Sequence, residues 1–220
     1  MPLEATHIRF ALDLQDKYEI KDLRQYISGA VYPDSRYITG IDRKLTHDDR
    51  CLLPEFAADD FKKGWQTHKI CDHTYDIVRK RLFPDLFPGN FDFYSHQDWI
   101  ISTAMKIIYD IEDMQSFDIQ KYLNCLEYAS NPNNEDISAV KEYNKILIDL
   151  YKNKKAITIE DSINMWKALG QDESICAELR KTTENLLKDQ KMVARIKLVY
   201  QEALDSYEDI VSNKIKILDI

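Results

Sequence analysis

Apolar residues recur every three to four positions in successive segments of the chain, which is the pattern of amphipathic helices. The segments predicted as helices are 4–16, 20–31, 59–81, 96–113, 118–129, 136–153, 159–169 and 173–215. Only 5 glycines and 6 prolines punctuate 220 residues, so few turns are signalled. We therefore expect an all-α fold.

Two helix ends are marked by a proline and a serine. Pro33 cannot continue the helix that precedes it, so Asp34 is expected at a corner. Ser95 is a predicted N-cap, with Asp98 at the third position of the following helix. The segments without a helical period are 35–58 and 83–95.

The composition favours one compact chain. Apolar residues make up 44% and charged residues 31%, so a sizeable core can form. We expect a helical core over 1–115 and a helical C-terminal part over 116–220 that packs on it. The four cysteines show no paired spacing, which favours reduced thiols, and no secretory signal is legible at the first residues. A cytoplasmic location is the resulting expectation.

The net charge of −8 argues against duplex nucleic acid as a stable partner, because such binding depends on Lys and Arg neutralising phosphates. The negative net charge does not exclude nucleotides or phospholipid head groups as ligands, since a bound metal ion reverses the local electrostatic field. No apolar run approaches ~20 residues, so no membrane span is expected.

All five histidines fall within the first 96 residues, where aspartates accompany them. His68 and Asp72 are four residues apart, so they project from the same side of one helix. Imidazole with carboxylate is a common ligand set for zinc, manganese and iron. When such a pair stands alone, a surface hydrogen bond is the better explanation of it.

The other candidates also have ordinary structural interpretations when each is taken alone. His7 fits a packed ring, Asp34 fits a turn former, and His47 follows Thr46 in what reads as a helix N-terminus. Their order along the chain is the more specific signal.

That order resembles the zinc-dependent phospholipase C family and its S1/P1 nuclease relatives over about the first third of the chain. The matching pieces are Thr6-His7 in MPLEATHIRFA, Gly29-x-x-x-Pro33-Asp34 in SGAVYPDSR, His47 in RKLTH, and Gly64-x-x-x-His68-x-x-x-Asp72 in GWQTHKICD.

The resemblance implies a single all-α domain of the phospholipase C/P1 nuclease type with a helical C-terminal extension. It also implies a buried polynuclear zinc site. The implied metal ligands are His7, Asp34, His47, His68 and Asp72. The family also uses a mature N-terminal amine, a later His and a His-x-x-x-Glu helix. The remaining histidines, His73 and His96, do not supply that helix, so one or two ions are expected instead of three.

The HD-domain phosphohydrolases are the neighbouring resemblance. Their pattern would be filled by His7, the doublet His47-Asp48, and Asp98 or Asp113. However, that doublet normally lies in an apolar helix, and the segment around His47 is polar. Two roles remain open for Asp98: that of a helix cap and that of a further metal ligand.

The resulting prediction is metal-dependent hydrolysis of a phosphoester, with zinc as the first choice and manganese or iron as alternatives. Asp34 is the candidate bridging ligand or general base, while Arg36 and Arg43 are candidates to bind phosphate oxygens. The substrate expected is a small soluble phosphomonoester or diester, a nucleotide or a phospholipid head group.

Two other functions remain open at the level of sequence. The long amphipathic helix predicted over 173–215 suits a non-catalytic interaction protein, with a second copy of the chain as one candidate partner. An inactive metal-binding domain is the third alternative.

Overall fold

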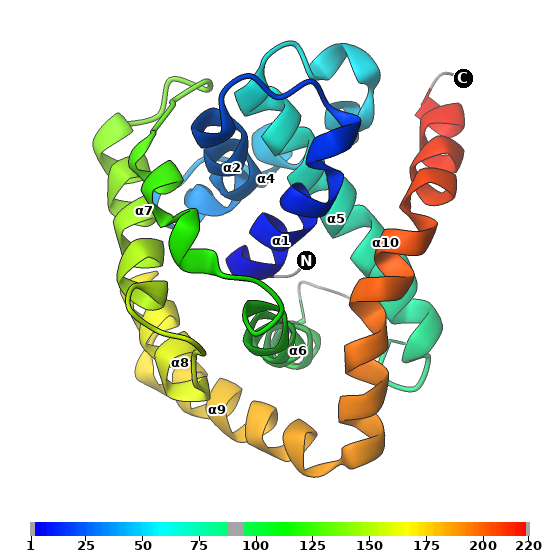
Figure 1. The fold of residues 1–220 in the computed structure, drawn as a ribbon. Coiled ribbons are helices and arrows are strands. Elements are labelled where there is room, and N and C mark those ends of the chain that lie inside the picture. Colours follow the sequence, from blue (N-terminus) through cyan, green and yellow to red (C-terminus); the bar gives the residue numbers. More distant parts are fainter. Residues whose placement is uncertain (1–2, 88–94, 219–220) are drawn as a thin grey trace.

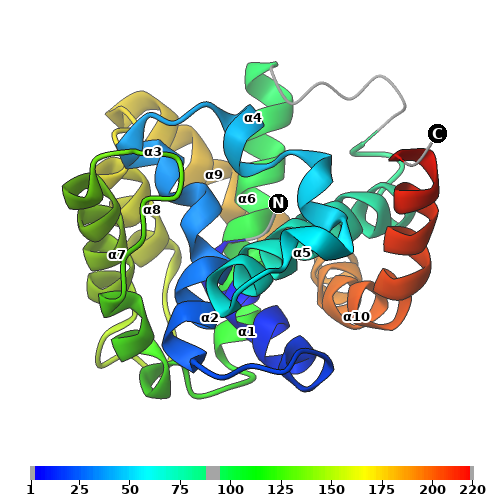
Figure 2. The same cartoon turned by 90° about the horizontal axis from the view of Figure 1, so that it is seen from above.

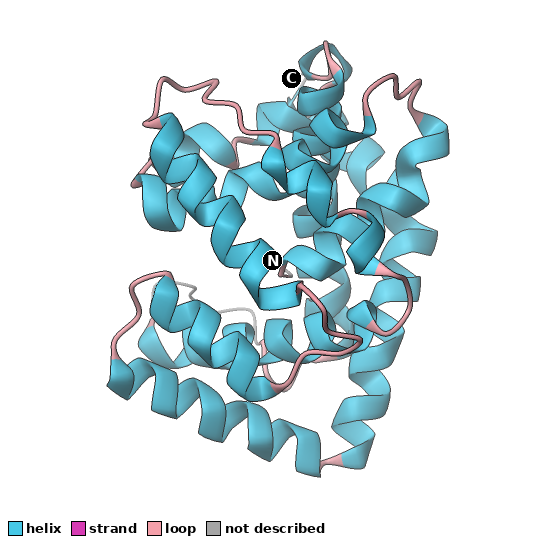
Figure 3. Ribbon diagram, turned by 60° about the vertical axis from the view of Figure 1, so that its left-hand side comes forward, coloured by secondary structure: helices cyan, strands magenta, loops and turns pink. Residues whose placement is uncertain are grey.

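The computed structural model describes residues 3–87 and 95–218, and every regular element within these ranges is a helix (Figure 3). The longer helices are α1 (Glu4–Leu14), α2 (Leu23–Val31), α5 (Asp60–Leu82), α6 (His96–Met114), α7 (Ile137–Tyr151), α8 (Ile159–Ala168), α9 (Glu173–Lys188) and α10 (Gln190–Leu218). The short helices are α3 (Arg36–Thr39) and α4 (Arg43–Thr46). The predicted all-α class is confirmed.

Helices α1, α2 and α5 lie together at the centre of the molecule, with α6 beside them (Figure 1). The chain from α7 to α10 runs around this centre as a rim, so that α9 packs on α6 and α10 packs on α5. The turned view shows α10 on the opposite side of the molecule from α7 and α8 (Figure 2). The C-terminal helices thus surround the segment that carries the predicted ligands.

Two glycines allow α2 and α5 to approach within backbone contact. A Cβ atom added to Gly64 would overlap the carbonyl oxygen of Tyr26, and one added to Gly29 would overlap the carbonyl oxygen of Phe61. Only a residue without a Cβ fits at such a crossing. The same contact brings the end of α2, and the corner after it, against the middle of α5.

The corner forms as predicted, because α2 ends at Val31 and a 3-10 turn, η2 (Tyr32–Ser35), contains Pro33 in its first turn. Ser95 is confirmed as the N-cap of α6. The irregular segment 35–58 holds α3, α4 and two 3-10 turns, η3 (Asp49–Leu52) and η4 (Pro54–Phe56). Of the predicted loop 83–95, residues 88–94 lie outside the described residues.

Two helix predictions were wrong in detail. The segment 118–129 forms 3-10 turns, η5 (Ile119–Lys121) and η6 (Leu123–Glu127), instead of an α-helix. The side-chain amide of Asn144 on α7 donates to the carbonyl oxygens of Leu126 and Tyr128, so α7 satisfies backbone groups at the end of this segment. Local periodicity does not reveal such partners.

The predicted helix 173–215 is also two helices, α9 and α10, which meet at Asp189. The Asp189 carboxylate accepts from the backbone N–H groups of Lys191 and Met192, as an N-cap does. The apolar stripe continues across the break, which explains why the periodicity suggested one element. No helix in the described ranges has the length and apolar character needed to cross a membrane.

Candidate metal centre

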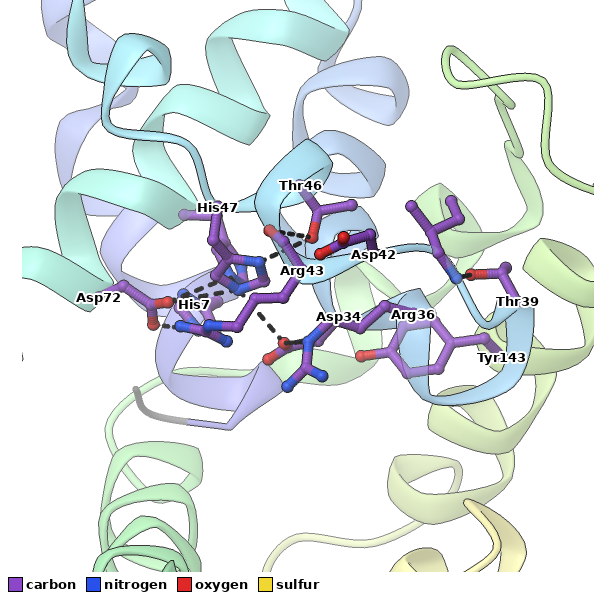
Figure 4. A network of polar contacts seen from close by, with 12 residues as sticks. His7, Asp34, Arg36, Thr39, Asp42, Arg43, Thr46, His47, Asp72 and Tyr143 are labelled. Carbon is purple, nitrogen blue, oxygen red and sulfur yellow. Dashed lines mark hydrogen bonds and ion pairs between the residues drawn. The ribbon is translucent and has the colours of Figure 1, made fainter. Parts of the chain in front are cut away.

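The five residues predicted as ligands from the resemblance converge in the folded chain (Figure 4). His7 comes from α1, Asp34 from η2, and His47 from the residue after α4, while His68 and Asp72 come from adjacent turns of α5. We call these five residues the His/Asp cluster. All five are buried, and their donor atoms form two overlapping groups, each of a size that a metal ion can join.

The first group centres on the Nε2 atom of His47. This nitrogen lies 3.3 Å from His68 Nε2, 3.4 Å from Asp34 Oδ1 and 3.5 Å from Asp72 Oδ2. Ligands about 2.0–2.1 Å from a tetrahedral zinc ion lie ~3.3 Å from one another. The separations in this group are therefore those of ligands around one ion.

The second group centres on Asp72. Its Oδ1 atom lies 3.5 Å from His7 Nε2, while its Oδ2 atom lies 3.7 Å from His68 Nε2. The rings of His7 and His68 stack with centroids 3.7 Å apart. Asp72 thus presents one oxygen to His7 and the other to His47 and His68, so its carboxylate spans the two groups. This two-sided position fits a bridging ligand better than that of Asp34, whose Oδ1 atom lies beside His47.

Hydrogen bonds behind the cluster fix which imidazole nitrogens face inward. The Nδ1 atom of His68 lies 2.8 Å from the Ala30 carbonyl oxygen, which only accepts, so Nδ1 carries the proton and Nε2 is bare. The Nδ1 atom of His47 lies 2.7 Å from the Thr46 hydroxyl, and that hydroxyl can donate to the Arg43 carbonyl oxygen at 3.4 Å. Outer partners of this kind are typical of metal-binding histidines.

Several atoms of the cluster have no hydrogen-bond partner. Both nitrogens of His7, both oxygens of Asp72 and the Oδ1 atom of Asp34 are buried without a hydrogen bond. Burial disfavours the charged imidazole, which lowers the pKa of His7 well below its ordinary value and that of His47 to about 4. Neutral imidazoles and unpartnered carboxylate oxygens are what a divalent cation requires, so the residues present fit one.

The two predicted phosphate-binding arginines differ in their relation to the cluster. Arg36 is half-buried, with Nε 3.6 Å from Asp34 Oδ1 and its guanidinium 4.2 Å above the ring of Tyr37. Arg43 is exposed on α4, although its residue lies beside the cluster in Figure 4. Arg36 is thus held against Asp34, while the Arg43 side chain runs from α4 over the cluster in the view of Figure 4.

The other acidic candidates lie outside the two groups of potential ligands among the described residues. Asp98 is in the first turn of α6, where its backbone N–H donates to the hydroxyl of the N-cap Ser95. Asp48 caps η3, and Asp113 accepts from the Thr6 hydroxyl at 2.6 Å. The two remaining histidines are also outside the groups: His73 is half-buried and His96 pairs with Glu178.

A polar face of α6 beneath α1 was not anticipated from the sequence. Asp110 accepts from the backbone N–H groups of Ala5 and Thr6 at 2.8 and 3.3 Å, and so caps the helix that carries His7. The Leu3 side chain provides no such cap. Charged residues at the spacing of Lys106, Asp110 and Asp113 within an otherwise apolar helix were the available signal.

Burial raises the pKa of Asp110 from 3.8 to about 7. The unfolded chain releases this proton near pH 3.8, so the folded state binds more protons between about pH 4 and 7, and stability falls as pH rises through that window. We expect Asp110→Asn to flatten this part of the pH profile, by at most about 1.4 kcal/mol per pH unit. Urea unfolding of chelator-treated protein at pH 5, 6, 7 and 8 measures it.

The exposed Asp16→Asn variant is the matched control and should follow the wild-type profile. Parallel profiles for Asp110→Asn and the wild-type protein would contradict the assignment of this pH dependence to Asp110.

Comparisons with protein-family models, with curated proteins and with solved structures give no match. The function is therefore inferred from the chemistry of the cluster.

Proposed function

We propose that the protein is a metal-dependent hydrolase of a phosphoester. The observation that carries this proposal is the convergence of three imidazoles and two carboxylates from four separate segments, in which the nitrogens of His7, both oxygens of Asp72 and the Oδ1 atom of Asp34 are buried without a hydrogen bond. A fold gains no stability from burying such groups without partners, so their retention favours a ligand that binds them.

His7, His47, His68, Asp34 and Asp72 would hold one or two divalent ions, with zinc favoured by the nitrogen-rich donor set and manganese or iron as alternatives. Such an ion supplies a hydroxide nucleophile near neutral pH by lowering the pKa of bound water to roughly 7. His68 can bind a metal ion only through its Nε2 atom, because its Nδ1–H donates to the Ala30 carbonyl oxygen. Asp72, whose two oxygens approach different histidines, would be the ligand shared by two ions if two are bound.

Phosphate suits the surroundings of the cluster. Asp34 can accept a proton as well as bind metal, which keeps it as the candidate general base. The half-buried guanidinium of Arg36, already held beside Asp34, can donate to a phosphate oxygen. We retain a small soluble phosphomonoester or diester, a nucleotide or a phospholipid head group as the substrate classes.

The test is reconstitution of chelator-treated protein with zinc, manganese or iron, followed by hydrolysis assays on model phosphomonoesters, phosphodiesters, nucleotides and a phospholipid. The proposal expects metal-dependent turnover of at least one class, lost on removal of the metal. A protein that takes up metal and hydrolyses none of these substrates would contradict the proposal and favour a non-catalytic metal-binding role.

A further inference from the structure

Lys106 is a largely buried lysine whose ammonium has no partner among the described residues. Only 5% of the residue is exposed, and its ammonium makes no hydrogen bond or ion pair within the described residues. The other buried cation in the part of the chain that the structure describes is paired: Arg79 donates to Asp76 at 2.7 Å and to Ser102 at 2.5 Å. A lysine is almost never buried in this way unless something neutralises it.

The helix places Lys106 toward the cluster. Lys106, Asp110 and Asp113 share one face of α6, since they are four and three residues apart. Asp113 binds Thr6, and Asp110 binds the backbone of Ala5 and Thr6. Lys106 lies one turn closer to the N-terminus of α6 than Asp110 does. It therefore lies beyond the first turn of α1, on the same side as the His/Asp cluster.

The charges that act on Lys106 lead to the same position. The carboxylates that attract its ammonium are Asp34 and Asp72, both members of the cluster, yet neither lies within ion-pair distance of 4.0 Å. Burial lowers the pKa of Lys106 to about 8, so the ammonium is still charged at pH 7. Lys106 is thus inferred to lie on the side of α1 where the cluster is, beyond ion-pair distance of the cluster's carboxylates, so an anion bound between them would meet metal on one side and ammonium on the other.

We propose that Lys106 is a substrate-binding residue whose ammonium contacts the phosphoryl oxygens of a phosphate group bound at the His/Asp cluster. This inference rests on the proposed function, because it needs metal in the cluster. In this arrangement the ammonium of Lys106 on α6 and the guanidinium of Arg36 would both contact the phosphoryl group. An anionic group would thus be bound by cations from two different elements.

The test uses zinc-loaded full-length protein with orthophosphate as the probe, titrated by calorimetry. We expect Lys106→Met and Lys106→Gln each to weaken phosphate binding at least about tenfold, as the loss of a charge-assisted contact predicts. Zinc content should be unchanged. Lys167→Met, which removes a lysine paired with Glu173 at 2.9 Å, is the matched control and should bind phosphate as the wild-type protein does.

A second readout separates ligand binding from a structural role. Because Lys106→Met removes an unpaired buried charge, the thermal midpoint of the metal-free protein should rise, by about 2 °C or more. If both variants instead lower the midpoint by about 5 °C or more, the ammonium stabilises the fold and the inference is wrong. It is equally wrong if either folded variant binds phosphate with wild-type affinity, or if the zinc-loaded wild-type protein binds none.

Phosphate binding is measured without turnover, so the two proposals can fail separately. Phosphate held through Lys106 in a protein that hydrolyses no phosphoester would overturn the proposed function alone. Metal-dependent hydrolysis that is unchanged in Lys106→Met, with unchanged phosphate affinity, would overturn the role of Lys106 alone.

Discussion

Replacing His68 with alanine is expected to remove bound metal and to reduce any metal-dependent hydrolysis by at least about 100-fold. His68 belongs to both groups of potential ligands, and its Nε2 atom is oriented inward by the bond from Nδ1 to the Ala30 carbonyl oxygen. Loss of an outer partner of a metal ligand already costs about 10–100-fold in affinity or activity, so loss of the ligand itself should cost more. Elemental analysis of the purified variant and a steady-state assay measure the two effects.

His73→Ala is the matched control, because His73 lies on the same helix, is half-buried and is outside the cluster. This variant should keep its metal and its activity. Equal metal content in His68→Ala and His73→Ala would show that the ions bind elsewhere.

Gly64→Ala is expected to destabilise the fold by at least about 3 kcal/mol, because the added methyl group overlaps the backbone of Tyr26 at the crossing of α2 and α5. Backbone atoms cannot move aside as the end of a flexible side chain can. Separating the two helices would also pull the Ala30 carbonyl from His68, so metal affinity should fall together with stability. Urea unfolding and metal titration of the same sample test both expectations.

The control for this variant is Gly40→Ala. Gly40 has a positive φ of 71°, but nothing lies within 4 Å of the position its Cβ would take. The cost there is conformational strain alone, about 1 kcal/mol. Similar losses for the two variants would mean that the crossing tolerates a wider helix separation.

Sequence patterns predicted most of the long helices because each one buries a continuous apolar face. They predicted less well where partners distant in the chain decide the backbone. The 3-10 turns of 118–129 meet the side chain of Asn144, and the division between α9 and α10 depends on a cap by Asp189 inside an unbroken apolar stripe. Neither interaction changes the spacing of apolar residues.

The convergence of the cluster residues could be anticipated because their order along the chain carries the information. His68 and Asp72 share a helix face, and Pro33 fixes the corner at Asp34. The support provided by α6 could not be anticipated in the same way. Asp110 meets α1, and Lys106 is buried, only through tertiary packing, whereas a charged residue in an isolated helix normally indicates a solvent-facing side.

The measurement that tests the central claim most directly is the metal content of the full-length protein, purified without chelator and without a nickel column. The His/Asp cluster predicts one or two equivalents of zinc, manganese or iron per chain, removed by a strong chelator and restored by titration to the same stoichiometry. A chain that contains no metal and takes up none on titration with any of the three would contradict the claim that these five residues form a metal centre.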